Sequence, residues 1–172
     1  MTDARLYRIL DANFNRSREG LRVAEEVVRF AVDSAALQKS FKRCRHDIQR
    51  VLEGFAISPR ELVRSREARG DVGRKPSFLE DRRRDLASVF LANVQRVKES
   101  LRALEEFSKL IDPKASRCLK EIRFRVYVLE KRALPKMESL RDHLSRKLLK
   151  PGQRGAGGSR PARRRQRRSA SR

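Results

Sequence analysis

The feature that most constrains the fold of this chain is an internal repeat. Residues 10–30 read LDANFNRSREGLRVAEEVVRF, and residues 90–110 read FLANVQRVKESLRALEEFSKL. At an offset of 80 residues, eight of these 21 positions carry the same amino acid. The segments that follow match more weakly at an offset of 78, where Lys42/Lys120 and Arg45/Arg123 are identical. A repeat of this length indicates that one structural unit occurs twice.

The residues of both units favour helices. Leu, Arg, Glu, Ala and Lys predominate, and all are strong helix formers. Asp33-Ser34 suits a helix break and N-cap, and Asp112-Pro113 suits a break because a residue before proline disfavours the α region. No stretch alternates with period two, so no sheet is expected. We predict helices over residues 4–32, 34–54, 79–111, 114–134 and 136–149.

The predicted fold is therefore all-α: a helical bundle of two repeated helical hairpins over residues 1–134, with a further helix in 135–150. Residues 151–172 contain eight of the arginines, no acid and no large apolar residue, so we expect a disordered basic tail. This tail supplies eight of the formal net charges of +22. The run RRRQRR within it makes nucleic acid an alternative partner, although the rest of the chain shows no recognisable nucleic-acid-binding module.

Composition excludes several other classes of protein. The longest apolar runs are four residues, so no transmembrane helix is expected, and the N-terminus has no apolar segment typical of a secretory signal. Cys44 and Cys118 are too few for a disulfide framework and are expected to be small buried residues. A cytoplasmic location is the expectation.

Polar side chains interrupt the apolar stripes of the two repeated helices. At about 100° per residue, Asn13 and Asn93 fall in the stripes, and Arg16 and Arg96 lie beside them on faces predicted to point inward. One interpretation is structural, with the arginines paired to carboxylates and the asparagines fixing helix register. The other is a polar pocket between the repeats, in which the arginines hold a phosphate and Asn or Glu orients a ligand or metal.

Two further sets of residues stand out. The long connection over residues 55–77 contains Arg69-Gly70-Asp71-Val72-Gly73, which is either a solvated loop or a segment that folds over a phosphate. Glu25-Glu26 and Glu105-Glu106 are expected on exposed faces, where they form ion pairs with Arg22, Arg29, Arg102 and Lys109.

Five motifs together resemble a known family. In chain order they are RILDANFNRSREGLRVAEEVVRF, RCRHDI, SREARGDVG, LANVQRVKESLRALEEFSKL and IRFRVYVLEKR. They are similar to the helical N-terminal domain found on many bacterial thiamine phosphate synthases, and the resemblance covers residues 5–132. That domain is implicated as a 4-amino-5-hydroxymethyl-2-methylpyrimidine phosphate kinase, so the resemblance implies ATP and Mg²⁺ as cofactors.

The helical phase, the connection over residues 55–77 and the family-like RCRHDI segment together give the candidate site residues of such a kinase. Those for phosphate or substrate are Asn13, Arg16, Arg45, His46, Asp71, Gly73, Asn93 and Arg96. Glu19 and Glu99 are the candidates for Mg²⁺. The sequence identifies no general base, and it contains no Walker motif, so a kinase of this kind has no common kinase fold.

The chain departs from the family pattern after residue 132, where too few residues remain for the (β/α)₈ synthase module. A small phosphorylated pyrimidine is the expected substrate. Either a standalone kinase domain works with a separate thiamine phosphate synthase as partner, or the chain is a truncated or frame-shifted product. A non-catalytic helical domain that docks a synthase is the main alternative. Association of two copies stays open.

Overall fold

The computed structural model describes residues 4–67, 70–71 and 83–148, with side chains described up to residue 142. This part contains five helices: α1 (Ala4–Phe30), α2 (Ala35–Glu53), α3 (Pro59–Arg64), α4 (Leu86–Ser108) and α5 (Pro113–Leu148). No strand occurs among these residues, so the prediction of an all-α fold is confirmed. The predicted tail over 151–172 lies outside the described residues.

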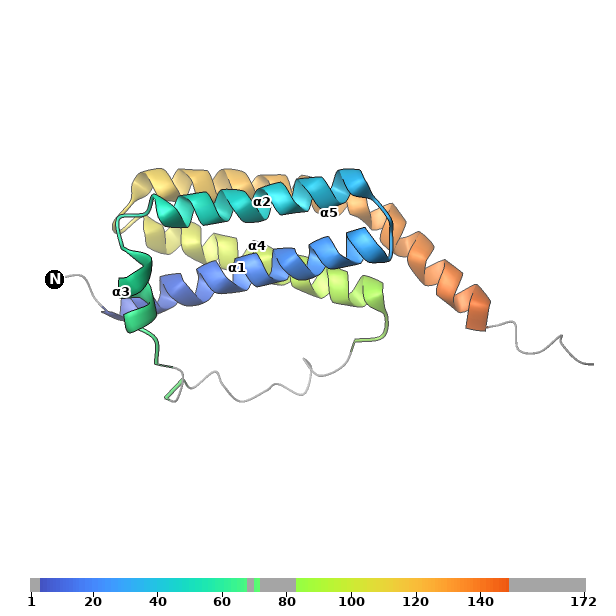
Figure 1. The fold of residues 1–172 in the computed structure, drawn as a ribbon, viewed down its shortest axis with the longest axis horizontal. Helices are drawn as coiled ribbons and strands as arrows, with labels where there is room; N and C mark the ends of the chain where they lie inside the picture. The colour runs from blue at the N-terminus through green and yellow to red at the C-terminus, as the bar shows by residue number, and fades with distance from the viewer. Residues whose placement is uncertain (1–3, 68–69, 72–82, 149–172) are drawn as a thin grey trace, which may run out of the picture.

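The four long helices form two layers (Figure 1). Helix α1 packs against α4 in one layer, and α2 packs against α5 in the other. Contacts within each hairpin, α1 with α2 and α4 with α5, join the layers. Each repeat therefore contributes one helix to each layer, which is the predicted bundle of two hairpins.

Helices α1 and α4 approach closely at Gly20. A Cβ atom at this position would lie 2.7 Å from Cγ2 of Val97 and 2.9 Å from the carbonyl oxygen of Asn93. Real Cβ contacts are longer than this, so the contact requires glycine. The crossing of the two repeated helices thus depends on one residue of the first repeat.

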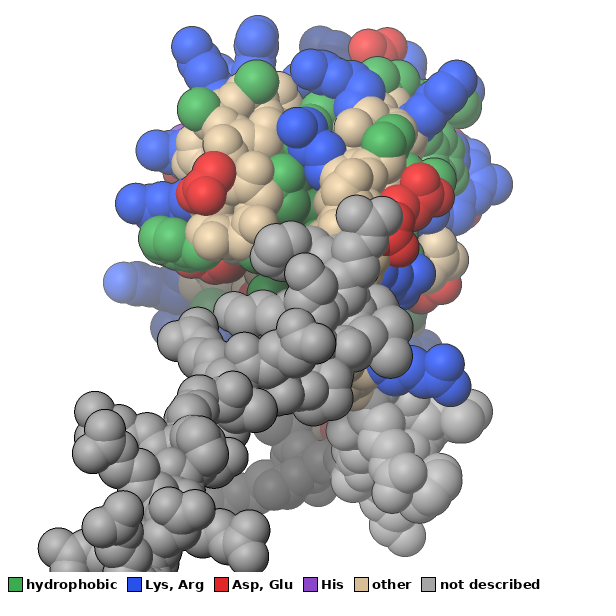
Figure 2. Space-filling model, turned by 90° about the vertical axis from the view of Figure 1, so that its right-hand side faces the viewer, with side chains coloured by type: hydrophobic (Ala, Val, Ile, Leu, Met, Phe, Trp, Pro, Cys, Tyr) green, Lys and Arg blue, Asp and Glu red, His purple; other side chains and the backbone are tan. Residues whose placement is uncertain are grey.

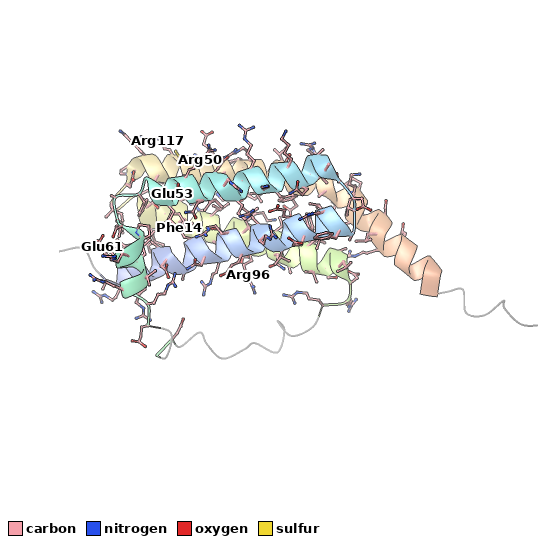
Figure 3. All side chains as sticks on the ribbon, in the orientation of Figure 1. Phe14, Arg50, Glu53, Glu61, Arg96 and Arg117 are labelled. Atoms are coloured by element: carbon pink, nitrogen blue, oxygen red, sulfur yellow. The ribbon has the colours of Figure 1, made fainter. Side chains whose placement is uncertain are left out.

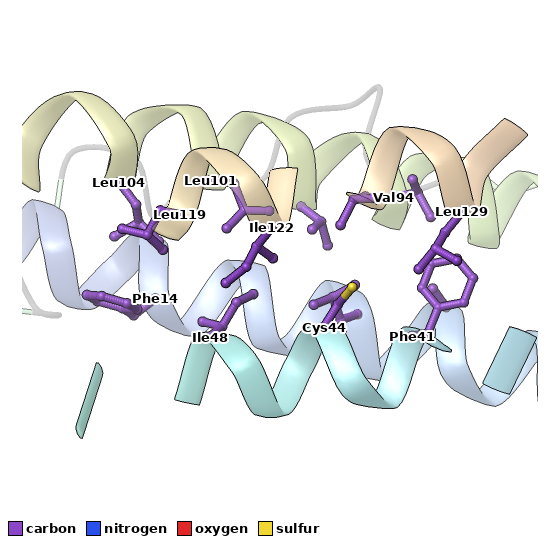
Figure 4. Packing of buried hydrophobic residues seen from close by; sticks show 14 of the residues in the cluster. Phe14, Phe41, Cys44, Ile48, Val94, Leu101, Leu104, Leu119, Ile122 and Leu129 are labelled. Atoms are coloured by element: carbon purple, nitrogen blue, oxygen red, sulfur yellow. The ribbon is translucent and has the colours of Figure 1, made fainter. Parts of the chain in front are cut away.

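An apolar core fills the space between the layers. Phe14, Phe41 and Phe90 are almost completely buried, and the rings of Phe41 and Phe90 meet edge to face with centroids 5.7 Å apart. Figure 4 shows Ile48 of α2 and Ile122 of α5 in the same layer of the core. Burial of each such side chain stabilises the fold by about 1.5–3 kcal/mol before entropy is counted.

Capping residues define the ends of these helices. Ser34 is the N-cap of α2, after Asp33 with a φ of 50°, and the carboxylate of Asp112 accepts a hydrogen bond of 2.9 Å from the Ala115 amide at the start of α5. Both predicted breaks are confirmed. The carboxylate of Asp85 caps α4 by accepting from the Ser88 amide at 2.6 Å. Hydrogen bonds from the Ser88 hydroxyl and from this amide lower the pKa of Asp85. The predicted helix start at 79 is wrong, because residues 83–85 are not helical.

Two other helix predictions need correction. Helix α5 runs without a break through Pro135, although a break was expected there. Pro135 removes one backbone hydrogen bond, but buried Ala133 and Met137 on either side hold the helix on the bundle. Helix α3 was not predicted, although Ser58 and Glu61 form a capping box at its start. The spacing of these two residues was the available sequence signal.

One ion pair joins the repeats. Nη1 of Arg125 in α5 lies 2.6 Å from Oδ2 of Asp47 in α2, and Arg50 contacts the other oxygen of the same carboxylate. Asp47 and Arg125 occupy equivalent positions at the 78-residue offset, so the repeat places opposite charges where the two copies meet. Burial acts to raise the pKa of Asp47, but the hydrogen bonds from Arg125 and Arg50 outweigh it and lower the pKa.

Candidate functional site

A pocket of about 440 Å³ lies beside the N-terminal half of α1. One wall is α1, and the other is the segment that follows α3. The polar lining includes Arg5, Arg8, Arg16 and Arg66, together with Asn13 and Asp71. The structure therefore brings together three of the residues predicted from the sequence, Asn13, Arg16 and Asp71, among several cations.

An ion pair fixes the second wall of this pocket to the first. The contact is bidentate: Nε and Nη2 of the Arg66 guanidinium lie 2.6 and 2.9 Å from the two carboxylate oxygens of Asp11. The hydrogen bonds to Asp11 raise the pKa of Arg66. Leu62 in α3 is buried in the core, and the ring of Phe55 packs on Phe14 at 5.6 Å. Sequence reasoning missed the pairing of Asp11 with Arg66, since 55 residues separate the partners.

Asn13 and Arg16 have different environments within the pocket. Nδ2 of Asn13 donates a hydrogen bond of 2.8 Å to the carbonyl of Ile9, and the side chain is half-buried. Arg16 is exposed, so the prediction that it points inward is wrong. The buried face of α1 passes through Phe14 and Ser17, and position 16 is rotated by about 100° from position 17.

The second repeat reproduces this arrangement at a different place. Asn93 is half-buried and donates to the Val89 carbonyl at 2.8 Å, while Arg96 is exposed, again contrary to the inward prediction. Figure 3 places Arg96 on the side of the α1–α4 layer that faces away from α2. The backbone of Asn93 faces Gly20. Asn13 lies seven residues before Gly20, which is roughly 10 Å along α1. The two Asn–Arg pairs therefore do not form the predicted common pocket between the repeats.

The other predicted residues are scattered. Glu19 and Arg45 line a separate hollow of about 430 Å³ between α1 and α2. His46 is exposed on α2, and Glu99 is exposed and accepts a hydrogen bond of 2.7 Å from Gln95. Gly73 lies outside the described residues. Glu19 and Glu99, the candidates for Mg²⁺, share no described pocket.

Two glutamates that were expected on exposed faces are buried. The exposed fraction of Glu25 is 2% and that of Glu105 is 5%. Arg45 binds Glu25 with Nε at 3.2 Å, and Arg123 binds Glu105 with Nη2 at 2.7 Å. These partners come from the second helix of the same hairpin, which the helix-by-helix interpretation did not consider. The expected same-helix partners also contact the buried carboxylates: Nη1 of Arg102 lies 2.9 Å from Glu105, and Nη1 of Arg22 lies 3.8 Å from Glu25. Glu26 and Glu106 do form the expected pairs with Arg22 and Arg102.

The pocket beside α1 combines four arginines with the carboxylates of Asp11, Glu67 and Asp71, an excess of one positive charge. Guanidinium groups bind phosphate through a planar set of donors, and several are needed where two phosphorylated molecules meet. Within the described ranges, no group of three or more His, Cys, Asp or Glu side chains could hold a metal by itself. Cys44 is buried, which raises the pKa of its thiol, whereas Cys118 is exposed, contrary to expectation. Neither cysteine lines this pocket.

No described helix combines the length and the apolar character that a membrane span needs.

Comparison with known proteins gives a consistent picture. The model of the ThiD2 family matches residues 8–132. Curated relatives include the thiamine-phosphate synthase of Nostoc punctiforme, 41% identical over 126 residues, which is 73% of this chain and 34% of the relative. The thiamine-phosphate synthase of Rhodopirellula baltica is 38% identical over 143 residues, which is 83% of this chain and 37% of the relative.

The thiamine-phosphate synthase of Thermosynechococcus vestitus is 43% identical over 127 residues, covering 73% of this chain and 34% of the relative. The chain thus spans about a third of the length of these relatives. No solved structure matches the chain.

Proposed function

We propose that this chain, which belongs to the ThiD2 family, works in thiamine biosynthesis as a phosphotransferase. It transfers the γ-phosphoryl group of ATP to 4-amino-5-hydroxymethyl-2-methylpyrimidine phosphate. The products are ADP and the pyrimidine pyrophosphate, which a thiamine-phosphate synthase then consumes. The names of the relatives support the pathway. The observation that supports the reaction class is the pocket beside α1, which four arginines line together with Asn13.

The chemistry of this transfer suits a pocket lined by several arginines. An oxygen of the substrate phosphate attacks the γ-phosphorus of ATP, the bond between the β–γ bridging oxygen and the γ-phosphorus breaks, and ADP leaves. The attacking phosphate is already largely ionised at neutral pH, because its second pKa is about 6. No side chain has to remove a proton from it. The protein has to hold two polyanions in line and neutralise their charge, which is the work of arginines and a metal ion.

The carboxylates of this pocket are compatible with the Mg²⁺ that accompanies ATP. Mg²⁺ usually takes one or two protein carboxylates and otherwise binds phosphate oxygens and water. Glu67 and Asp71 supply carboxylates at the rim, so a cage of several acids is not required. When bound, the metal would neutralise charge on the phosphates.

Individual residues have distinct proposed roles. Arg16, exposed at the pocket, binds a substrate phosphate, and the amide oxygen of Asn13 orients a ligand donor. Asp11 is a positioning residue, because it holds Arg66 and with it the second wall. The proposed roles of Arg45, His46, Gly73, Asn93, Arg96, Glu19 and Glu99 stay predictions from the sequence.

The test is an assay of the full chain with the pyrimidine phosphate, ATP and Mg²⁺. We expect ADP release that depends on the pyrimidine phosphate, with the pyrophosphate seen by phosphorus NMR. Arg16→Ala should lower kcat/KM by about 100-fold, as loss of one donor to a transferred group does. Arg43→Ala, an exposed arginine on α2, is the matched control and should leave the rate unchanged. Absence of substrate-dependent ADP release would instead favour a non-catalytic domain that accompanies a synthase.

A further inference from the structure

The outward face of α5 carries two exposed apolar side chains between opposite charges. We call Glu121, Phe124, Val128 and Lys131 the α5 seam. Their spacing of three, four and three residues places them along one side of the helix, as in the contact line of paired helices. Phe124 is 52% exposed and Val128 is 58% exposed, while the side chains of Glu121 and Lys131 are also exposed.

The fold itself does not require this face to be apolar. At the 78-residue offset, the residues of α2 equivalent to Phe124 and Val128 are His46 and Arg50, and both are exposed. The first repeat therefore presents polar groups where the second presents an aromatic ring and a valine. An apolar pair on one repeat only is typical of an interaction surface rather than of a folding requirement.

We propose that the α5 seam binds the same seam of a second copy of this chain, with the two helices antiparallel about a two-fold axis. An axis at the level of Val126 puts Phe124 opposite the partner's Val128, since each is two residues from the axis. The same axis puts Glu121 opposite the partner's Lys131, each five residues away. Two-fold symmetry forms each of these contacts twice.

Charge supports this register. Neither Glu121 nor Lys131 forms an ion pair within the described part of the chain, so both are available to a partner. A chain with a net charge of +22 repels its own copies, and Lys and Arg side chains surround most of the bundle end that Figure 2 shows. Within the seam the two charges cancel and are complementary to themselves, while Lys120 and Arg125 lie beside it and line the same hollow as Phe124 and Val128. This inference does not rest on the proposed phosphotransfer.

The test is the molar mass of the full chain, free of nucleic acid, by sedimentation at increasing concentration. We expect the mass to rise from 20.0 kDa toward twice that value. Glu121→Lys and Lys131→Glu should each weaken the dimer roughly tenfold or more, because each turns two attractive pairs into two repulsive ones. Combining both substitutions restores the pairs with inverted signs and keeps the net charge, so it should restore dimerisation.

Lys39→Glu, on the exposed side of α2, is the matched control for the change in net charge and should not weaken the dimer. Phe124→Ser should weaken it without any change in charge. If the mass stays at 20.0 kDa at a chain concentration of about 100 μM, which is far above a micromolar Kd, the proposal is overturned. A dimer that ignores both single charge reversals, or a double variant that stays monomeric, would overturn the register. Far-UV circular dichroism confirms that each variant folds.

Discussion

In the first repeat, Asp11 of α1 binds Arg66, whereas the same position of the second repeat is Leu91. Arg5 and Arg8 line the pocket of the first repeat. Their equivalents in the second repeat are Asp85 and Ser88, which form the N-cap of α4 and contact Arg141 of α5. The opening turns of two similar helices thus serve different purposes.

The features that do not differ are equally informative. Both repeats keep a buried glutamate bound to an arginine of the neighbouring helix, and both keep an asparagine bonded to the carbonyl four residues before it. Shared contacts hold each hairpin together, and contacts that only one repeat has build a pocket or a surface. This division suggests where substitutions should change stability and where they should change function.

The largest change in stability is expected at the more buried of the two Glu–Arg ion pairs that both repeats share. Arg123, the partner of Glu105, is 11% exposed, whereas Arg45, the partner of Glu25, is 26% exposed. Glu105→Gln should cost about 3 kcal/mol, because an uncompensated charge stays buried, and Glu25→Gln should cost less. Urea unfolding at neutral pH measures both. An equal or larger loss for Glu25→Gln would contradict the idea that burial ranks the two pairs.

A smaller loss is expected at the helix crossing. Gly20→Ala should cost about 2 kcal/mol by overpacking against Val97, although alanine favours helices by about 1 kcal/mol over glycine. Ser100→Ala, at the equivalent position of the second repeat, is the control and should cost less, because it introduces no larger side chain. Thermal unfolding shows whether Gly20→Ala lowers or raises the stability. A stabilised variant would show that α1 and α4 can separate freely.

The smallest effect concerns the bond between the repeats and depends on pH. Because the pKa of Asp47 is lowered in the folded chain, its stabilising effect is complete above its unfolded pKa of about 3.9 and is lost as pH falls through the folded pKa. Asp47→Asn should cost about 1 kcal/mol at neutral pH. The difference from the unsubstituted chain should shrink as pH falls below about 4. A difference that stays constant down to pH 2 would mean that the charge of Asp47 does not hold the repeats.

Much of the fold could be predicted because its determinants are local. The duplicated motif, the break at Asp33-Ser34 and the break at Asp112-Pro113 are all readable within a few residues. The side-chain positions were less predictable, since the phase of a single helix does not reveal which neighbour covers it. Arg16 therefore seemed to point inward, and Glu25 seemed exposed.

The candidate site was predictable only in part for the same reason. Asn13, Arg16 and Asp71 were identified from the sequence and do line one pocket. Arg66 was not identified, because its partner is distant in the chain and α3 brings the two together. The expectation of a single pocket shared by both repeats failed because the two helices run antiparallel, which separates Asn13 from Asn93.

The central claim is that the first repeat carries the phosphotransfer site, and the matched pair Arg16→Ala and Arg96→Ala tests it most directly. The measurement is kcat/KM for ADP release with the pyrimidine phosphate, ATP and Mg²⁺. We predict a loss of about 100-fold for Arg16→Ala and a loss at least ten times smaller for Arg96→Ala. Equal losses in the two variants would contradict the claim and assign the site to both repeats.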